Sequence, residues 1–439
     1  MSKYTWAIAY FFQVVLCGYA LLEAENSTTL SFQEALEPIL KMQNEGKLDG
    51  TVLIAKGTQQ VVLLDNSNDK LDPCQGLGGQ YLLASTGKQM IAIAVLKAIY
   101  DNASGTTDEI RLQKTKEAIN SALIHFLPAT DKVWNGKVPD WANKITIHQM
   151  LSHRSGLPEY TSYPAFFEKD IEGKDFSKKH HETWEILKII EGQPLNFEPG
   201  TSEAYNNTSY TLLTEVIQNI TKMPAKDYMN KYLFKELGMH DTWAVDQGTE
   251  SSLRKQKETR CLLKSMKYNP LSKSQEIYTI EDLDDIGKGG GVSIVSTAID
   301  LLKWNLGVHR DHCCIPKELY EQFIYPHSKG PSGYGYGYGI ARDKSKFGIA
   351  LNHSSGSVRN IYVPSEELSL IVLTHVGYDW DRVEPIIQSR IDELVNSSSM
   401  NRQEADQQAL KEILIQYPVS DRGFEGIVSI FNKYLNISP

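Results

Sequence analysis

Hydrophobic and polar residues alternate with two different periods along the chain, and the change of period separates strands from helices. Residues 51–65 alternate around the turn that begins at Gly57, which is typical of an antiparallel hairpin. Residues 347–377 contain three further strand-like runs separated by glycine, proline and serine. We therefore expect strands near both ends of the chain.

The chain between these strands has mainly helical periodicity. Apolar residues recur at helical spacing in segments 89–100, 110–127, 183–192, 209–221 and 296–306. This order predicts a mixed α+β fold, in which an antiparallel sheet pairs its first and last strands and is flanked by helices. An all-helical region is expected as an insertion at about residues 85–330.

The N-terminal segment has a different composition. Residues 6–22 are apolar and uncharged, and a polar stretch follows them, as in a secretory signal with cleavage after Ala20 or Ala24. An uncleaved membrane anchor is the main alternative, because the run approaches the length that spans a bilayer. Lipid attachment at Cys17 is disfavoured because Leu16 stands where a small residue is usual.

Length and composition fit one large domain between two terminal segments. We assign residues 1–24 to a signal peptide or anchor, residues 25–395 to the main domain, and residues 396–439 to a C-terminal helical tail. The formal charge of -9 favours neither nucleic acid nor anionic lipid as a partner. Contact with a membrane is expected only through the N-terminal segment.

Metal, disulfide and phosphate chemistry find little support in the sequence. Four cysteines outside the N-terminal segment are too few for a disulfide scaffold, and their pairing cannot be deduced. His312-Cys313-Cys314 lacks the ligand spacing of a zinc site. Gly87-Lys88 lacks the other residues of a phosphate-binding loop. We therefore expect no metal and no organic cofactor.

Ser85 and Lys88 begin an almost entirely apolar helical segment. Three residues are nearly one helical turn, so both side chains project from the same side of the helix start. In a buried position a lysine loses favour for its charged form, and a neutral amine can accept a proton from a neighbouring hydroxyl. The alternative is a helix-capping serine beside a lysine that reaches solvent.

Two further motifs could join this pair. Tyr205 and Asn207 follow a Pro-Gly turn and lie two residues apart, so both can point the same way; a phenol near an ammonium can act as a base. The alternative is a buried tyrosine beside an Asx helix cap. Residues 352–356, from Asn352-His353 to Gly356, lie on a strand-like run near the end of the chain. Backbone N–H groups of such a strand could form an oxyanion hole. An ordinary strand histidine is equally compatible with that run.

Together and in this order, the three motifs resemble the serine beta-lactamase and penicillin-binding-protein superfamily. The most similar branch is the class C beta-lactamase-like group of esterases and D-alanyl-D-alanine peptidases. Segments 145–160, 197–213 and 287–304 are also similar to motifs of that group. The resemblance spans roughly residues 30–380 and implies a beta-lactamase/transpeptidase-like fold.

The resemblance also implies roles for single residues. Ser85 would be the acylated nucleophile and Lys88 its proton partner. Tyr205 would be a general base and later an acid, and Asn207 a ligand of the substrate amide. His353 stands where many relatives carry the lysine of a K-T-G triad. The N–H groups of Ser85 and Gly356 would form the oxyanion hole.

Two departures from the family pattern bear on the substrate. Ser355 and Arg359 stand where relatives have glycines; Arg359 could bind a substrate carboxylate or point outward. His353 is mostly neutral near pH 7, so a permanent cation for the carboxylate of a beta-lactam is missing. The sequence therefore favours a peptidase or esterase over a beta-lactamase.

The sequence as a whole predicts a serine hydrolase that acts through an acyl-enzyme. Its substrates would be D-alanyl-D-alanine-type peptides or small esters and amides, with a peptidoglycan stem peptide among the candidates. A beta-lactamase and a catalytically silent envelope protein that binds peptidoglycan peptides are the alternatives. A glycan on Asn207, which lies in a glycosylation sequon, would block the site, so we expect export to a periplasm or bacterial cell envelope.

Overall fold

The computed structural model describes most of the predicted main domain. The described residues are 31–44, 50–65, 79–166, 181–246, 265–269, 274–278, 292–329, 335–355, 358–374, 376–378, 389–394, 396–397, 405, 408–409, 412 and 424–437. The predicted N-terminal segment (1–24) and Gly356 lie outside them.

A six-stranded antiparallel sheet forms the centre of the molecule, in the order β2-β1-β11-β10-β9-β8. Its first and last parts in sequence lie side by side, with Gly50 of β1 opposite Thr374 of β11. The predicted hairpin, the three C-terminal strands and the pairing of both ends are therefore confirmed. The strands are β1 (Gly50–Lys56), β2 (Gln59–Asp65), β8 (Ala341–Ser345), β9 (Gly348–Ser355), β10 (Val358–Val363) and β11 (Leu368–Thr374).

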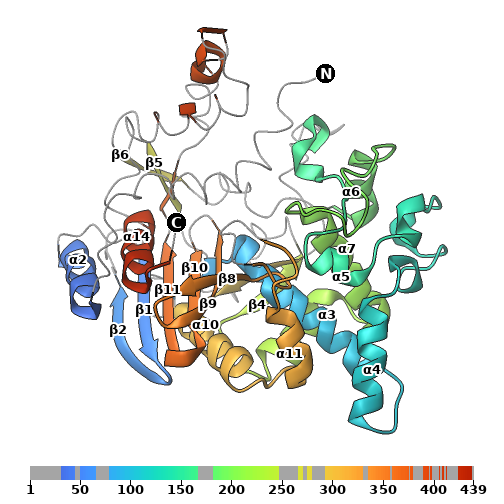
Figure 1. Ribbon diagram of the computed structural model, residues 1–439, viewed down its shortest axis with the longest axis horizontal. Coiled ribbons are helices and arrows are strands. Elements are labelled where there is room, and N and C mark those ends of the chain that lie inside the picture. Colours follow the sequence, from blue (N-terminus) through green and yellow to red (C-terminus); the bar gives the residue numbers. More distant parts are fainter. Residues whose placement is uncertain are drawn as a thin grey trace.

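Helices cover both faces of this sheet. Val52 and Ile54 of β1 contribute to a core beneath α2 (Phe32–Asn44) and α14 (Phe424–Leu435), whereas Leu53 contributes to the larger core on the other face. This alternation follows from the two-residue period of a strand. Figure 1 shows α2 and α14 side by side at the β1–β2 end. The last helix of the predicted tail is thus packed on the body.

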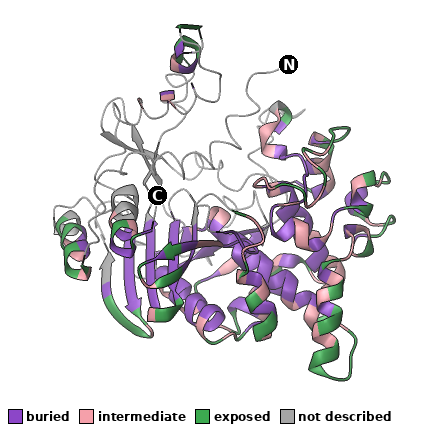
Figure 2. Cartoon of the chain, in the orientation of Figure 1, coloured by how far each residue is buried: buried purple, intermediate pink, exposed green. Residues whose placement is uncertain are grey.

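The helical region lies beyond the larger core. There α3 (Lys88–Asn102) packs against α7 (Asn207–Thr221) and α4 (Asp108–Ile119), and α10 (Ala298–Trp304) packs on β1 and β11. Burial is continuous from the sheet through α3, while much of α4 is exposed (Figure 2). The other main helices are α5 (Ile147–Leu151), α6 (Thr183–Ile189), α8 (Ala225–Met229) and α11 (Lys317–Ile324).

Two small sheets complete the described strands. β7 (Val292–Ser296) lies between β3 (Tyr81–Leu82) and β4 (Trp243–Asp246), and β5 (Ser265–Asn269) lies between β6 (Ser274–Tyr278) and β12 (Val376–Tyr378). The antiparallel main sheet with its helical region confirms the predicted mixed α+β fold.

One predicted helix is shorter than expected. The segment predicted at 110–127 is helical only to Ile119, and Leu123–His125 form a separate 3₁₀ turn. Asn120 and Ser121 donate side-chain hydrogen bonds back to the last helical turn, which competes with its continuation. Leu123 N–H donates instead to Ile145 O, a partner far along the chain. Periodicity alone cannot reveal such a contact.

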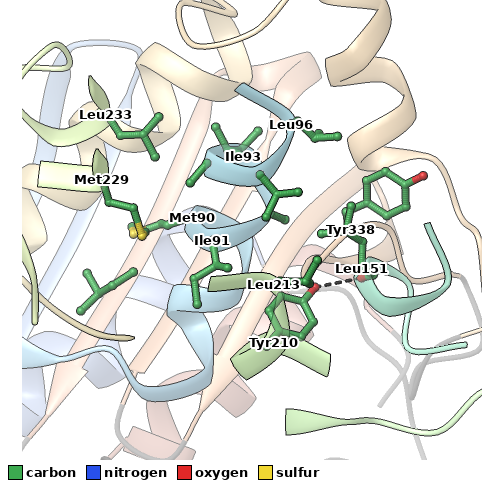
Figure 3. Close-up of a cluster of buried hydrophobic side chains, with 14 of the residues drawn as sticks. Met90, Ile91, Ile93, Leu96, Leu151, Tyr210, Leu213, Met229, Leu233 and Tyr338 are labelled. Atoms are coloured by element: carbon green, nitrogen blue, oxygen red, sulfur yellow. Dashed lines mark hydrogen bonds between the residues drawn. The ribbon is translucent and has the colours of Figure 1, made fainter. Parts of the chain in front are cut away.

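Helix α3 is buried on nearly all sides. Its Met90 and Ile93 are fully buried, and Figure 3 shows them among side chains of α5, α7, α8 and the neighbouring Tyr338. Tyr210 in this cluster donates its hydroxyl proton to Leu151 O at 2.9 Å. Each fully buried large aliphatic side chain contributes about 1.5–3 kcal/mol. The apolar surroundings therefore hold the start of α3 in a fixed position.

Gly339 makes a close backbone approach to the start of α3. It has a φ of +71°, and a Cβ there would lie 2.7 Å from both C and O of Lys88. We expect Gly339→Ala to lower the free energy of unfolding by about 2 kcal/mol or more, because strain and a backbone clash add. Gly192→Ala is the control: its φ is +76° but nothing lies within 4 Å. Urea unfolding should give that control a loss of only about 1 kcal/mol; equal losses would contradict the clash.

Candidate active site

Ser85 and Lys88 lie together at the start of α3, as predicted. Ser85 belongs to a 3₁₀ turn, η1 (Ala84–Gly87), that leads directly into the helix. Lys88 Nζ donates to Ser85 Oγ at 3.1 Å. The preceding Ala84 has a φ of +44°, a conformation that L residues rarely adopt and that occurs preferentially at functional sites. The pair is therefore held by a strained turn on a buried helix.

Tyr205 and Asn207 reach this pair from the start of α7. Tyr205 donates its hydroxyl proton to Ser85 Oγ at 2.6 Å, and Asn207 Oδ1 accepts from Lys88 Nζ at 2.7 Å. The intervening Asn206 caps α7 by accepting from Ser209 N–H. Tyr205 and Asn207 thus contact the same serine–lysine pair, as the two-residue spacing predicts.

Burial governs the charge of Lys88. The side chain is only 7% exposed, and loss of solvent lowers its pKa from 10.5 to about 7, while the nearby carboxylate of Glu159 acts in the opposite direction. Its amine also lies over the ring of Tyr205, 4.8 Å from the centroid. An amine with this pKa is partly neutral near pH 7 and can accept a proton from Ser85.

The pKa of Tyr205 shifts in the opposite direction to that of Lys88, away from its usual value. Burial raises the pKa of its phenol, the hydrogen bond to Ser85 partly offsets this, and the charge of Glu159 raises it further. The phenol therefore keeps its proton near pH 7. The general-base role that the resemblance implies for Tyr205 would require a phenolate, and a low-dielectric site makes that charged form unfavourable.

Two residues that the sequence analysis did not single out support the cluster. His153, with a φ of +58°, accepts from Asn206 N–H through Nδ1 and packs 4.5 Å from the ring of Tyr205. Burial, together with Lys88 and His353, keeps its pKa well below the usual range. Glu159 accepts from the side chain of Asn207 at 3.1 Å. Both lie in segment 145–160, whose similarity to the family was the available signal.

His353 lies on β9, which packs against η1. It is buried and pairs with Asn360 of β10, and its Nε2 lies 3.4 Å from the hydroxyl of Tyr336. In the described register β8 pairs with β9 only as far as Asn352. Residues 353–355 therefore form a local edge of the described sheet, next to the turn that carries Ser85. Gly356, the other predicted donor of the oxyanion hole, stays untested.

Arg359 does not join this cluster. On β10 it alternates with Val358, which belongs to the core on the α3 side, so the two side chains lie on opposite faces of the sheet. Arg359 is 5% exposed, and its guanidinium donates to Asn432 Oδ1 of α14 at 3.4 Å. The prediction that Arg359 stands near the cleft or points outward is therefore wrong, because the strand register turns it beneath α14.

The described residues contain no group of three or more His, Cys, Asp or Glu side chains placed to hold a metal ion. Cys313 and Cys314 are both free thiols. The cluster around Ser85 brings together a hydroxyl, an amine and a phenol.

The family described as Beta-lactamase matches residues 42–389, which is most of the chain. The chain belongs to the beta-lactamase family. Its Ser85, Lys88, Tyr205 and Asn207 all fall within the matched residues, and the geometry above shows that they meet in one place.

Single relatives and solved structures are also similar to this beta-lactamase family member. It is 30% identical over 156 residues to a Salmonella typhimurium protein named "Putative D-alanyl-D-alanine carboxypeptidase"; this match covers 34% of each chain, so the chain spans about a third of that relative's length. The fold is similar to a penicillin binding protein from Bacillus halodurans (TM-score 0.58, 20% identity, 80% of this chain and 98% of the other). It is also similar to D-amino acid amidase from Ochrobactrum anthropi (TM-score 0.53, 16% identity, 87% and 98%).

Within the part of the chain that the structure describes, no helix combines the length and apolar character needed to cross a bilayer.

The lowered pKa of Lys88 should make stability depend on pH. The unfolded lysine holds its proton up to about pH 10.5, whereas the folded one releases it near 7, so the unfolded state binds more protons between these values. The free energy of unfolding of the wild type, relative to Lys88→Met, should therefore rise with pH across this window, by at most about 1.4 kcal/mol per unit. Denaturant titrations at several pH values test this. A difference that does not change with pH would contradict the lowered pKa.

Proposed function

We propose that this protein is a serine hydrolase that forms an acyl-enzyme on Ser85. One observation carries the proposal: Ser85 Oγ lies within hydrogen-bond distance of both an amine, Lys88 Nζ at 3.1 Å, and a phenol, Tyr205 OH at 2.6 Å. A serine hydroxyl needs an adjacent base to become a nucleophile, and the leaving group needs an adjacent acid.

The two pKa shifts suggest which group does what. Neutral Lys88 takes the proton as Ser85 Oγ forms its bond to the substrate carbonyl carbon. Tyr205, which keeps its phenolic proton, then donates it to the leaving amine or alcohol as the old C–N or C–O bond breaks. In a second step water attacks the acyl carbon and gives a proton to the Tyr205 phenolate. The Lys88 ammonium returns its proton to Ser85 Oγ as the acyl–oxygen bond breaks, which releases the acid and restores all three groups. Environments that push two pKa values apart are a general means of separating base from acid.

We favour small esters, small amides and D-alanyl-D-alanine-type peptides as substrates. The printed names of a carboxypeptidase relative and of an amidase with a similar fold support this class. Arg359 lies against α14, so it offers no guanidinium to a substrate carboxylate. Small esters and amides without a carboxylate are therefore the best candidates of this class, ahead of D-alanyl-D-alanine-type peptides, and beta-lactamase activity is the second possibility. We also propose that residues 6–22 direct export to the cell envelope.

Covalent labelling tests the nucleophile. A fluorophosphonate probe should modify the wild type at Ser85, because the hydroxyl is activated by Lys88, and should not modify Ser85→Ala. Ser121→Ala is the control, because Ser121 follows α4 and its Oγ donates to Glu117 O of that helix. Mass spectrometry of the labelled peptide reports the site. A folded wild type that takes no label would support the silent peptide-binding alternative, and label on another serine would contradict the assignment of Ser85 as the nucleophile.

Turnover separates the substrate classes. We expect kcat/KM to be highest for a short-chain nitrophenyl ester or a D-amino acid amide, lower for a D-Ala-D-Ala peptide, and lowest for nitrocefin, because Arg359 is turned away from Ser85. Lys88→Met should reduce turnover of every substrate by about 10²–10⁴-fold, the usual contribution of a general base. Nitrocefin as the preferred substrate would overturn this order.

A further inference from the structure

Glu159 is a buried carboxylate directly behind the residues already described. It precedes the short 3₁₀ turn η5 (Tyr160–Ser162) and is 7% exposed. Its Oε1 accepts from Thr161 N–H at 3.3 Å, from the Thr161 hydroxyl at 2.8 Å and from Asn207 Nδ2 at 3.1 Å. Its Oε2 accepts from Asn207 N–H. Two donors from Thr161 and two from Asn207 therefore meet the two oxygens of this carboxylate.

These contacts determine how the amide of Asn207 is oriented. An asparagine side chain can present either its oxygen or its NH₂ group to a neighbour, and the partners decide which. A carboxylate can only accept, so Glu159 requires the NH₂ group on its own side. The oxygen must then face Lys88, which donates to it at 2.7 Å. Without the carboxylate, the amide could turn and place NH₂ against the ammonium.

The capping of η5 does not account for this arrangement. A cap requires only the bond from Thr161 N–H. The two bonds from Asn207 tie the same carboxylate to the first residue of α7, 48 positions further along the chain. They connect the loop to the catalytic cluster.

We propose that Glu159 is a positioning residue of this site, which fixes the Asn207 amide with its oxygen toward Lys88 and supplies the buried negative charge opposite the amine. The proposal rests on the proposed function of Ser85 and Lys88 as an acylation pair. It adds a residue that acts through Asn207 and does not touch the nucleophile.

The charge of Glu159 acts on Lys88 against the effect of burial. Burial lowers the pKa of the amine, and Glu159 raises it. The other groups that face the amine are Asn207, Ser85, the rings of Tyr205 and Tyr210, and His153, whose own pKa is held far below its usual range. Glu159 is therefore the charge whose removal should shift the titration of Lys88 to lower pH.

The pH dependence of Ser85 labelling separates this role from a merely structural one. In the wild type, the rate of Ser85 labelling should rise with pH near 7, where Lys88 loses its proton, and then reach a plateau. In Glu159→Gln this acid limb should move to lower pH. The plateau rate should fall roughly 10- to 100-fold, because Asn207 is no longer fixed. If the substitution only loosens the fold, water reaches the amine and the limb moves to higher pH. A fall in rate with no shift, or with a shift to higher pH, would overturn the proposal.

Two variants control for charge and for the loss of a carboxylate. Glu159→Asp keeps the charge but shortens the side chain, so its acid limb should stay within about 0.3 units of the wild type while its plateau falls severalfold. A wild-type plateau in that variant would contradict the positioning role, even if Glu159→Gln does not fold. Glu215→Gln removes a hydrogen-bonded carboxylate from α7, the helix that begins at Asn207; Glu215 accepts there from Thr183 and Gln218. This variant should leave both the acid limb and the plateau of the labelling rate unchanged.

A direct titration makes the result independent of catalysis. The ¹⁵Nζ resonance of Lys88, assigned by its absence from Lys88→Met, should titrate near pH 7 in the wild type and at lower pH in Glu159→Gln. If this shift occurs but Ser85 is never labelled, the proposed hydrolase function fails while the role of Glu159 stands. If Ser85 is labelled but the Lys88 titration does not move, the role of Glu159 fails alone.

Discussion

A buried lysine amine joins the helix that begins beside Ser85 to the helix that carries Asn207. Lys88 Nζ donates to Ser85 Oγ and to Asn207 Oδ1, and it lies over the ring of Tyr205. Taking a charged amine out of water is costly, and proteins reduce that cost by neutralising or pairing the group. Here burial lowers the pKa of the amine to about 7, and Glu159 lies close enough to oppose the shift. This balance makes the amine useful as a proton acceptor near neutral pH.

The hydrophobic core makes that burial possible. Because α3 is surrounded by apolar side chains on nearly every side, its first turn cannot move toward solvent and expose the lysine. Gly339 lets another backbone segment approach the backbone of Lys88 closely. The sheet behind η1 contributes β9, whose described edge at residues 353–355 lies next to the turn that carries Ser85. The stability of the fold and the chemistry of the site thus depend on the same packing.

The opposite face of the sheet has a separate arrangement. Arg359 of β10 lies beneath α14 near Asn432, and Asn352 of β9 donates to the buried Asp343 of β8. These polar groups alternate along the strands with residues that face α3, so neighbouring positions in the sequence serve different purposes. Among the described residues, Arg359 and Asp343 therefore lie on the face of the sheet opposite α3 and Ser85.

The sequence by itself predicted most of the strands and the residues that meet around Ser85. Strand alternation predicted β1, β2, β9, β10 and β11 and the pairing of both ends, and the three-residue spacing predicted the contact between Ser85 and Lys88. These features are local or follow from a strong period, and the resemblance of three motifs to one family joined residues far apart in the chain.

Only the tertiary structure decided on which face of the sheet a strand residue lies, which distant residue it contacts, and how burial shifts its pKa. The register of β10 turned Arg359 away from Ser85, a contact with Ile145 replaced the expected continuation of α4, and Glu159 acquired its role only when Asn207 came within reach. The protonated phenol of Tyr205 was likewise hidden from the sequence. A pKa depends on how much water and which charges surround a group, and both are set by the packing of segments far apart in the chain.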